Sequence, residues 1–446
     1  MNYFRVLTLL VGSALITSCV NDQDDDYISI EQTALTKQII ALYGSKEALL
    51  LPSETDFENI PADPNNPITK EKIVLGKFLF HETAIASNSK SSMGEKTYSC
   101  ASCHHAEAGF QSGMKQGIGE GGIGFGIMGE TRVMNPDYDE SMIDVQPILS
   151  PTIINSAYQK NMLWNGQFGA TGKNEGTAAH WTPNTPKESN LLGFEGLETQ
   201  AIAGLGVHRL EINEALITEL NYITYFDAAF PNTNKAERYT KITAGLAIAA
   251  YERTVTANKA PFQQWLKGDE TALSQEETAG AALFFGKGKC YSCHSGPSLS
   301  DMNFYALGMH DLSGPDVHGI VDEATKKGRG GFTKNPDDDY AFKTPTLYNL
   351  KGLSFLGHGG SFNSVAQVIS YKNNARKENG DVPENKIDIQ FSALGLTNSE
   401  ITQLALFIEN GLYDNDLARF VPESLPSNAC FPNADEQSKE DMNCGG

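Results

Sequence analysis

Two copies of one five-residue motif constrain this chain of 446 residues more than any other feature. Residues 100–104 read Cys-Ala-Ser-Cys-His, and residues 290–294 read Cys-Tyr-Ser-Cys-His. The C-x-x-C-H pattern is the attachment signature of a c-type haem, in which two thiols bond to the porphyrin and the histidine supplies an axial imidazole. A zinc site or two redox dithiols is the alternative, and two complete copies among only seven cysteines disfavour it. We therefore predict two covalently bound haem c groups, held by Cys100, Cys103, His104, Cys290, Cys293 and His294.

The first eighteen residues have the features of a secretory signal. A single positive charge at Arg5 precedes a mostly apolar run over 6–16, which is shorter than the roughly 20 residues that cross a bilayer. The sequence Ile-Thr-Ser-Cys that ends at Cys19 resembles the bacterial lipoprotein box, so we predict lipidation of Cys19. A cleaved signal with a free Cys19 is the alternative. We expect a mature protein on the periplasmic side or the cell surface, tethered to a bacterial membrane only through a lipid anchor.

The remaining two cysteines, Cys430 and Cys444, lie in a short polar tail. Because haem attachment takes place outside the cytoplasm, where disulfides persist, we expect these two to form a disulfide. The net charge of −21 argues against a nucleic-acid partner and against an anionic membrane surface. It permits steering of a basic partner, although most acidic surfaces serve only solubility. Residues 21–26 (Asn-Asp-Gln-Asp-Asp-Asp) have the composition of a solvated tether.

The local patterns are helical. Ser274 with Glu277 and Thr397 with Glu400 form capping boxes, and the second of these helices is expected to stop at Gly411. Further helices are expected from Thr69 through Leu79 and over 239–256, the latter with Ile242, Leu246 and Ala249 on one face. We predict a mainly α fold with two cytochrome c-like haem domains and long loops. The predicted segments are 1–18 (signal), 19–65 (acidic tether and N-terminal segment), 66–255 and 256–425 (haem domains) and 426–446 (tail).

Two long loops separate the expected helices. Residues 117–129 are dense in glycine, but no strand precedes them and no Gly-Lys-Ser/Thr follows, so a phosphate-binding loop is disfavoured. We expect a flexible loop beside the first haem. Residues 165–198 also have loop composition, and loops of this length in compact proteins usually serve function.

From about Leu75 to Tyr371 the chain resembles the bacterial dihaem cytochrome c peroxidase family, including its MauG-like branch. The resemblance rests on short stretches that recur in order around the two haem motifs. These are Leu-Gly-Lys-Phe-Leu-Phe at 75–80, Pro-Thr-Ile-Ile-Asn at 151–155, Trp-Asn-Gly at 164–166, Glu-Thr-Gln-Ala at 198–201, Ala-Ala-Tyr-Glu-Arg-Thr at 249–254, Phe-Lys-Thr-Pro-Thr-Leu-Tyr-Asn at 342–349 and His-Gly-Gly-Ser-Phe at 358–362.

The resemblance implies that the first haem, on His104, reacts with peroxide while the second, on His294, stores an electron. It places Trp164 between the haems as a relay; a tryptophan buried only for packing is the alternative. Many members block the first iron at rest with a histidine where this chain has Glu120. Carboxylate is a poor haem ligand, so we expect an open first haem, unless His81, His180 or His208 takes that place.

The resemblance also implies a distal glutamine and an acid, which we assign to Gln200 and, after a one-residue insertion, to Glu211. His208 and Arg209 are competent substitutes, and Glu211 as an exposed residue of a first helical turn is the alternative. The sixth ligand of the second haem is a methionine or tyrosine in the family. Tyr371 is our candidate, with a core tyrosine as the alternative reading and Met309 as a fallback.

The family's calcium site lacks its asparagine, since Leu149 stands there; calcium remains possible only through carbonyls and water. We predict a peroxidase that reduces hydrogen peroxide to water with electrons from a small donor protein, a cytochrome c or a cupredoxin. The alternatives are a MauG-like oxidase that modifies a partner protein and a non-catalytic dihaem electron carrier. A polar distal cluster disfavours the carrier. The oligomeric state stays open, with a homodimer as one option.

Overall fold

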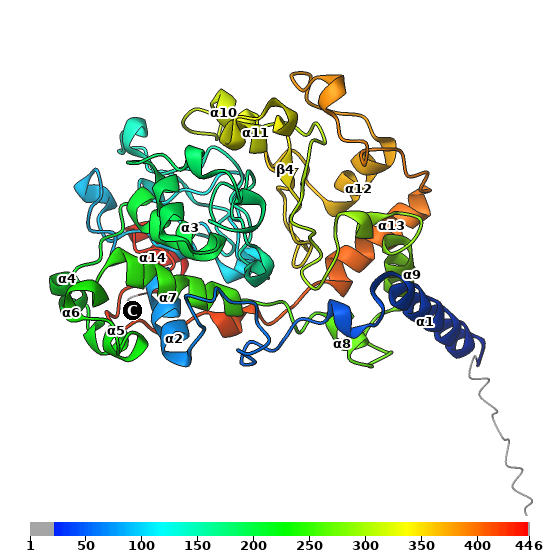
Figure 1. The fold of residues 1–446 in the computed structure, drawn as a ribbon, viewed down its shortest axis with the longest axis horizontal. Helices are drawn as coiled ribbons and strands as arrows, with labels where there is room; N and C mark the ends of the chain where they lie inside the picture. The colour runs from blue at the N-terminus through cyan, green and yellow to red at the C-terminus, as the bar shows by residue number, and fades with distance from the viewer. Residues whose placement is uncertain (1–21, 445–446) are drawn as a thin grey trace, which may run out of the picture.

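Helices and long loops make up nearly all of the chain (Figure 1). The computed structural model describes residues 22–444, with side chains from Glu31 onward. The α-helices are α1 (Asp22–Tyr43), α2 (Lys70–His81), α3 (Gly196–Val207), α4 (Glu214–Glu219), α5 (Ile223–Ala229), α6 (Lys235–Arg238), α7 (Lys241–Thr254), α8 (Pro261–Leu266), α9 (Gln275–Phe284), α10 (Glu323–Lys326), α11 (Arg329–Thr333), α12 (Val365–Asn374), α13 (Asn398–Leu406) and α14 (Glu436–Asp441). The predicted mainly α architecture is confirmed.

Strands are few and short. Strand β1 (Gly122–Ile123) pairs antiparallel with β2 (Val133–Met134), and β3 (Phe304–Tyr305) pairs antiparallel with β4 (Phe342–Lys343). No helix within residues 22–444 is both long and apolar enough to cross a membrane. The predicted signal 1–18 and the predicted lipidation site Cys19 lie outside the described residues.

Local capping signals set where several helices begin. The Thr69 side chain accepts a hydrogen bond from the Lys72 amide at the start of α2. Both predicted capping boxes are present, at the start of α9 and of α13. The predicted apolar face of α7 is wrong in part, because Ile242 is 43% exposed. Nearly the whole circumference of α7 after residue 242 is buried instead, since α2 and α3 both pack against it.

The N-terminal segment differs from the prediction. Residues 22–26, expected to form a solvated tether, lie in the first turns of α1. Farther along this helix Leu35 and Ile39 are fully buried, and the Gln32 amide donates to the Thr278 hydroxyl of α9 over 2.9 Å. The composition of residues 22–26 therefore gave no sign that the later part of α1 is amphipathic and packs against α9.

Each motif lies beside a helix pair that meets at a glycine. A Cβ atom added at Gly76 of α2 would collide with the Ala247 carbonyl of α7, and one added at Gly280 of α9 would collide with the Gln403 carbonyl of α13. The two helix groups occupy opposite sides of the molecule in Figure 1, with α2, α3 and α7 on one side and α9, α12 and α13 on the other. Because only glycine permits this approach, both positions are fixed by backbone packing.

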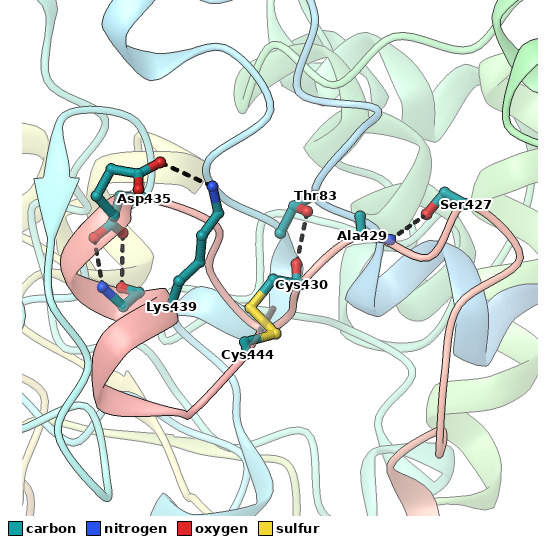
Figure 2. The surroundings of a disulfide bond; sticks show 9 residues. Thr83, Ser427, Ala429, Cys430, Asp435, Lys439 and Cys444 are labelled. Carbon is teal, nitrogen blue, oxygen red and sulfur yellow. Dashed lines mark hydrogen bonds and ion pairs between the residues drawn. A yellow bond between two sulfur atoms is a disulfide. The ribbon is translucent and has the colours of Figure 1, made fainter. Parts of the chain in front are cut away.

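The tail closes back on the first half of the chain. Cys430 and Cys444 form the predicted disulfide, and the Thr83 hydroxyl donates to the Cys430 carbonyl over 2.8 Å (Figure 2). The Asp435 carboxylate accepts from the Gly124 amide at 3.0 Å, and the Asp441 carboxylate accepts from the Phe125 amide at 2.7 Å. These contacts join loop 117–129 to residues about 300 positions away in the sequence, where local composition gives no sign of them. The predicted flexibility of the loop stays a prediction.

The glycine contact predicts a contrast between two alanine variants. Gly76→Ala should lower the free energy of unfolding by about 1–3 kcal/mol, as overpacking does. Gly206→Ala, in α3 with no atom within 4 Å of the added methyl, should leave stability unchanged or raise it by about 0.4–1 kcal/mol. Denaturant unfolding of both variants measures the difference. Equal stability of the two would show that the α2–α7 contact is looser than described.

The tail contacts predict a local effect of removing the disulfide. In a Cys430→Ala/Cys444→Ala variant, the amides of Phe125 and Gly126, which donate to Asp441, should exchange with solvent faster, because the segment that carries Asp441 is released. Amides in α13 serve as the internal control. Unchanged exchange at residues 124–126 would show that the tail holds the loop without the disulfide.

Candidate haem sites

The first motif forms a tight 3-10 turn. The backbone amides of Cys103 and His104 both donate to the Cys100 carbonyl over 3.2 Å. The hydroxyls of Ser99 and Ser102 donate to the Pro432 carbonyl of the tail, over 2.8 and 3.2 Å. The His104 ring donates from Nδ1 to the Phe110 carbonyl at 3.3 Å. Burial lowers the pKa of His104 to about 4, so the ring is neutral at physiological pH, as an iron ligand must be.

The second motif repeats this arrangement. The His294 amide donates to the Cys290 carbonyl over 2.8 Å, and its ring donates from Nδ1 to the Leu299 carbonyl at 3.0 Å. Burial is again the main reason that the pKa of His294 falls to about 4. A hydrogen bond from Nδ1 to a backbone carbonyl fixes the tautomer of the ring and leaves the Nε2 lone pair free for a metal. Both motifs therefore have the geometry that axial haem ligation requires.

A cavity of about 320 Å³ lies beside the second motif. Its lining includes Cys290, Cys293 and His294, together with apolar side chains of the second half. Residues from the first half also contribute, among them Leu149 and Trp164. A mostly apolar cleft next to two thiols and a neutral imidazole suits a porphyrin.

Trp164 lies between the surroundings of the two motifs. Its indole lines the cavity and donates to the Leu149 carbonyl over 2.8 Å. Three residues after Leu149, the Thr152 hydroxyl donates to the Gly109 carbonyl over 2.6 Å. Gly109 directly precedes Phe110, whose carbonyl accepts the hydrogen bond from the His104 ring. A short path of hydrogen bonds and backbone thus links the tryptophan to the first motif; the position of Trp164 as a relay between haems stays a prediction.

Glu120 is fully buried and serves as an anchor. Its carboxylate accepts from the amides of Lys90 and Ser91, at 2.6 and 3.1 Å, and from the side chains of Tyr138 and Arg209. Three of these donors bind Oε1 and one binds Oε2, so four hydrogen bonds hold the carboxylate in its place. The structure is thus consistent with the expectation that Glu120 is no ligand.

The other candidate histidines differ in position. His81 is buried among Phe80, Tyr251 and Phe431, and its Nδ1 donates to the Lys77 carbonyl over 2.8 Å. His180 lies against Phe332, with the ring centroids 6.2 Å apart. Neither interaction involves a residue of the first motif.

His208 pairs with Asp144, a residue that the sequence did not single out. The distance from His208 Nδ1 to Asp144 Oδ2 is 2.8 Å. Burial lowers the pKa of His208, but the charge and hydrogen bond of Asp144 outweigh it, so the pKa is raised overall. Burial raises the pKa of Asp144, and the charge of His208 reverses this, so that pKa is lowered overall. The His208 charge also acts on His104, which places this ion pair beside the first motif.

Among the described residues, no hydrogen bond or ion pair joins the predicted distal pair, Gln200 and Glu211. Gln200 is half-buried on α3, and its side-chain amide makes no hydrogen bond to any residue in the described range. Glu211 lies just beyond α3, where its amide donates to the Ile85 carbonyl over 2.8 Å. Its carboxylate forms an ion pair with Lys241 at 3.2 Å and is 32% exposed.

The structure does not bring Tyr371 to the cavity. Its hydroxyl donates to the Leu307 carbonyl, and its ring packs between Phe362 and Phe391. Consecutive residues of a helix point about 100° apart, and the cavity is lined by the next residue, Lys372. Met309, the fallback ligand, does line the cavity.

Comparison with known proteins identifies the family. The family described as di-haem cytochrome c peroxidase matches residues 70–271. A cytochrome-c peroxidase of Denitromonas iodatirespirans is 30% identical over 371 residues, which cover 78% of this chain and 84% of that protein. The chain belongs to the di-haem cytochrome c peroxidase family. It is thus an oxidoreductase of the peroxidase type, and membership implies haem c cofactors at the two motifs.

Other relatives fall in the MauG-like branch. The methylamine utilization protein MauG of Methylorubrum extorquens is 27% identical over 316 residues, which cover 70% of this chain and 72% of that protein. The solved structure of a MauG-like protein associated with microbial copper homeostasis superposes with a TM-score of 0.58 at 23% identity, covering 82% of this chain and 95% of that one. This structural likeness shows a shared fold.

Metal sites built from side chains alone are not evident in residues 22–444, where no group of three or more His, Cys, Asp or Glu could hold an ion. The carbonyl of Leu149, the residue that replaces the expected calcium-binding asparagine, accepts the hydrogen bond from Trp164.

The His208–Asp144 pair predicts a pH window of stabilisation. A histidine with a raised pKa stabilises the fold fully below its unfolded pKa of about 6.5, and an aspartate with a lowered pKa does so above about 3.9. His208→Asn keeps a hydrogen bond to Asp144 without the charge. Its deficit in unfolding free energy should be largest between about pH 4 and 6.5 and should shrink as pH rises through the folded pKa of His208. A deficit that does not vary with pH would contradict the ion pair.

Proposed function

We propose that the chain reduces hydrogen peroxide to water at a first haem held by Cys100, Cys103 and His104. Electrons are delivered through a second haem, held by Cys290, Cys293 and His294, from a small donor protein. A haem iron supplies the redox chemistry of O–O cleavage when it is bound. The residues of the chain hold the porphyrins, orient the imidazoles and move protons.

One observation carries this division of labour, namely the difference between the two surroundings. Beside the first motif lie charged and hydrogen-bonded groups, the His208–Asp144 pair and Arg209 on Glu120. The cavity at the second motif is mostly apolar and lies against Trp164. Peroxide reduction consumes protons and needs polar groups, whereas an electron store does not.

The domain proposal follows the two helix groups. Residues 66–255 contain α2, α3 and α7 with the first motif, and residues 256–425 contain α9, α12 and α13 with the second. The repeated glycine contacts at Gly76 and Gly280 support two haem domains of related construction.

For the proton carrier we propose Glu211, assisted by Gln200. The resemblance to the family supports this assignment. In addition, the Glu211 backbone amide donates a hydrogen bond to the Ile85 carbonyl, and Ile85 belongs to the same hydrophobic core as Ala101 of the first motif. His208 is the second candidate, because its charge acts on His104 and its raised pKa suits proton transfer near neutral pH.

The donor proposal is a small cytochrome c or cupredoxin. The net charge of −21 supports a basic partner steered to an acidic surface. The attachment of haem c and the Cys430–Cys444 disulfide support a location outside the cytoplasm, and lipidation of Cys19 is the proposed means of membrane attachment.

A second function is a MauG-like oxidation of a partner protein. Two observations favour it: Glu120 stands where many peroxidases have a blocking histidine, and the MauG proteins are among the relatives.

The proposed function predicts peroxide-dependent oxidation of a reduced small c-type cytochrome by the holo-protein. Glu211→Gln should lower kcat by about 10²–10⁴-fold, the usual worth of a general acid–base group. Lys241→Met is the matched control, since it removes the ion pair at 3.2 Å but keeps the carboxylate, and it should retain most of the activity.

Two other outcomes would change the proposal. A loss confined to His208→Asn would move the proton carrier to His208. A holo-protein that takes electrons from the donor but never passes them to peroxide would contradict the peroxidase proposal.

A further inference from the structure

One face of α12 borders the second motif. Val365, Val368, Ile369 and Lys372 line the same cavity as Cys290, Cys293 and His294. Their spacing of three, four and seven residues is that of a single helix face. Lys372 therefore projects on the cavity side, one helix position after Tyr371, whose ring packs between Phe362 and Phe391.

Lys372 is an unusual lysine in this setting. Its side chain is partly buried, and its Nζ lies 5.8 Å from the centroid of the Phe391 ring. Its charge in turn acts on His294 and on Cys290, so the amine lies close to the attachment motif. No hydrogen bond or ion pair to its Nζ exists among the described residues.

Three other lysines line the cavity, and each is either exposed to solvent or paired with another group. Lys289 is exposed to solvent. Lys326 forms an ion pair with Glu323 at 2.8 Å. Lys343 donates to the Asn161 carbonyl at 2.7 Å and to the Gln159 side chain. Lys372 has the Phe391 ring as a cation–π neighbour, but of the four it is the one lysine that is neither exposed nor joined to a hydrogen-bond or ion-pair partner among the described residues.

Among the other side chains that could bind an iron, two tyrosines are engaged elsewhere. The Tyr371 hydroxyl donates to the Leu307 carbonyl. The His358 ring stacks on Phe342 with 3.7 Å between the ring centroids, and its buried Nε2 lies 3.4 Å from the Asp311 carboxylate without a hydrogen bond. The Tyr305 hydroxyl donates to the Asp301 carboxylate over 2.6 Å. Met309 lines the cavity, with its sulfur packed beside the backbone of Gly357.

We propose that Nζ of Lys372 is the second axial ligand of the haem iron held by His294. The ammonium group releases one proton to solvent, and the lone pair of the neutral amine takes the coordination position. This inference rests on the part of the proposed function that attaches a haem at residues 290–294, and it is independent of any peroxide chemistry.

Lysine ligation has consequences that methionine ligation does not. An amine is a harder donor than a thioether, so it favours ferric iron, whereas methionine raises the reduction potential of a c-type haem. The second haem should therefore be low-spin and of lower potential than a histidine–methionine haem.

Spectroscopy of the ferric holo-protein tests the ligand directly. The haem content of each variant is measured first, and two haems per chain are expected throughout. Lys372→Ala should abolish the wild-type low-spin EPR signal of the second haem. Lys372→Met, of similar length, should raise the potential and introduce the near-infrared sulfur-to-iron band of a methionine ligand. Tyr371→Phe and Met309→Leu are the matched controls and should keep the wild-type spectrum.

The outcomes separate the two proposals. Loss of the second haem from the wild-type protein would overturn the attachment on which the proposed function rests. With both haems present, an unchanged low-spin signal in Lys372→Ala would overturn lysine ligation. A changed signal in Met309→Leu or Tyr371→Phe, with Lys372→Ala unchanged, would assign the position to that residue instead.

Discussion

The bond from each motif histidine to a backbone carbonyl is the interaction on which the haem sites depend. His104 donates to Phe110 and His294 to Leu299, in both cases from Nδ1. The bond selects the tautomer, orients the ring and leaves Nε2 available. The carbonyl itself must be placed, and for Phe110 the Ile153 amide does this over 3.2 Å. The ring of one residue is thus aligned by a segment some fifty residues away, the same segment whose Leu149 carbonyl receives the Trp164 indole.

The two halves share their construction and differ in what surrounds it. In each, a helix carries a glycine that lets a second helix approach its backbone, at Gly76 and at Gly280. The same helices carry a Leu-Phe pair three residues later, at 79–80 and 283–284. The surroundings of these two helix pairs differ. Ion pairs lie near the first motif, and an apolar cavity lies beside the second. Equivalent frames with unequal surroundings allow two chemically identical cofactors to differ in reactivity and potential.

Local signals in the sequence predicted what is local in the structure. Caps at Thr69, Ser274 and Thr397 located the starts of three helices because capping involves side chains within four residues. The haem motifs and the tail disulfide are equally self-contained patterns. Partners that are distant in the sequence were not predicted. Asp144 pairs with His208, 64 positions away, and no local pattern around either residue indicates the pair. The sixth ligand of the second haem stays a prediction. Adjacent residues of a helix point about 100° apart, so the Tyr371 hydroxyl reaches the Leu307 carbonyl while Lys372 lines the cavity.

The attachment of the tail to the first motif and to loop 117–129 couples two distant parts of the chain. The Pro432 carbonyl receives the hydroxyls of Ser99 and Ser102 beside the first motif, and Asp435 and Asp441 hold the glycine-rich loop. Ser99 and Pro432 are 333 positions apart in the sequence, yet this contact borders the turn that carries Cys100 and Cys103. The surroundings of the first motif are therefore completed by a segment that the covalent chain does not hold nearby. A change in the tail should be felt at residues 99–104 before it is felt at the second motif.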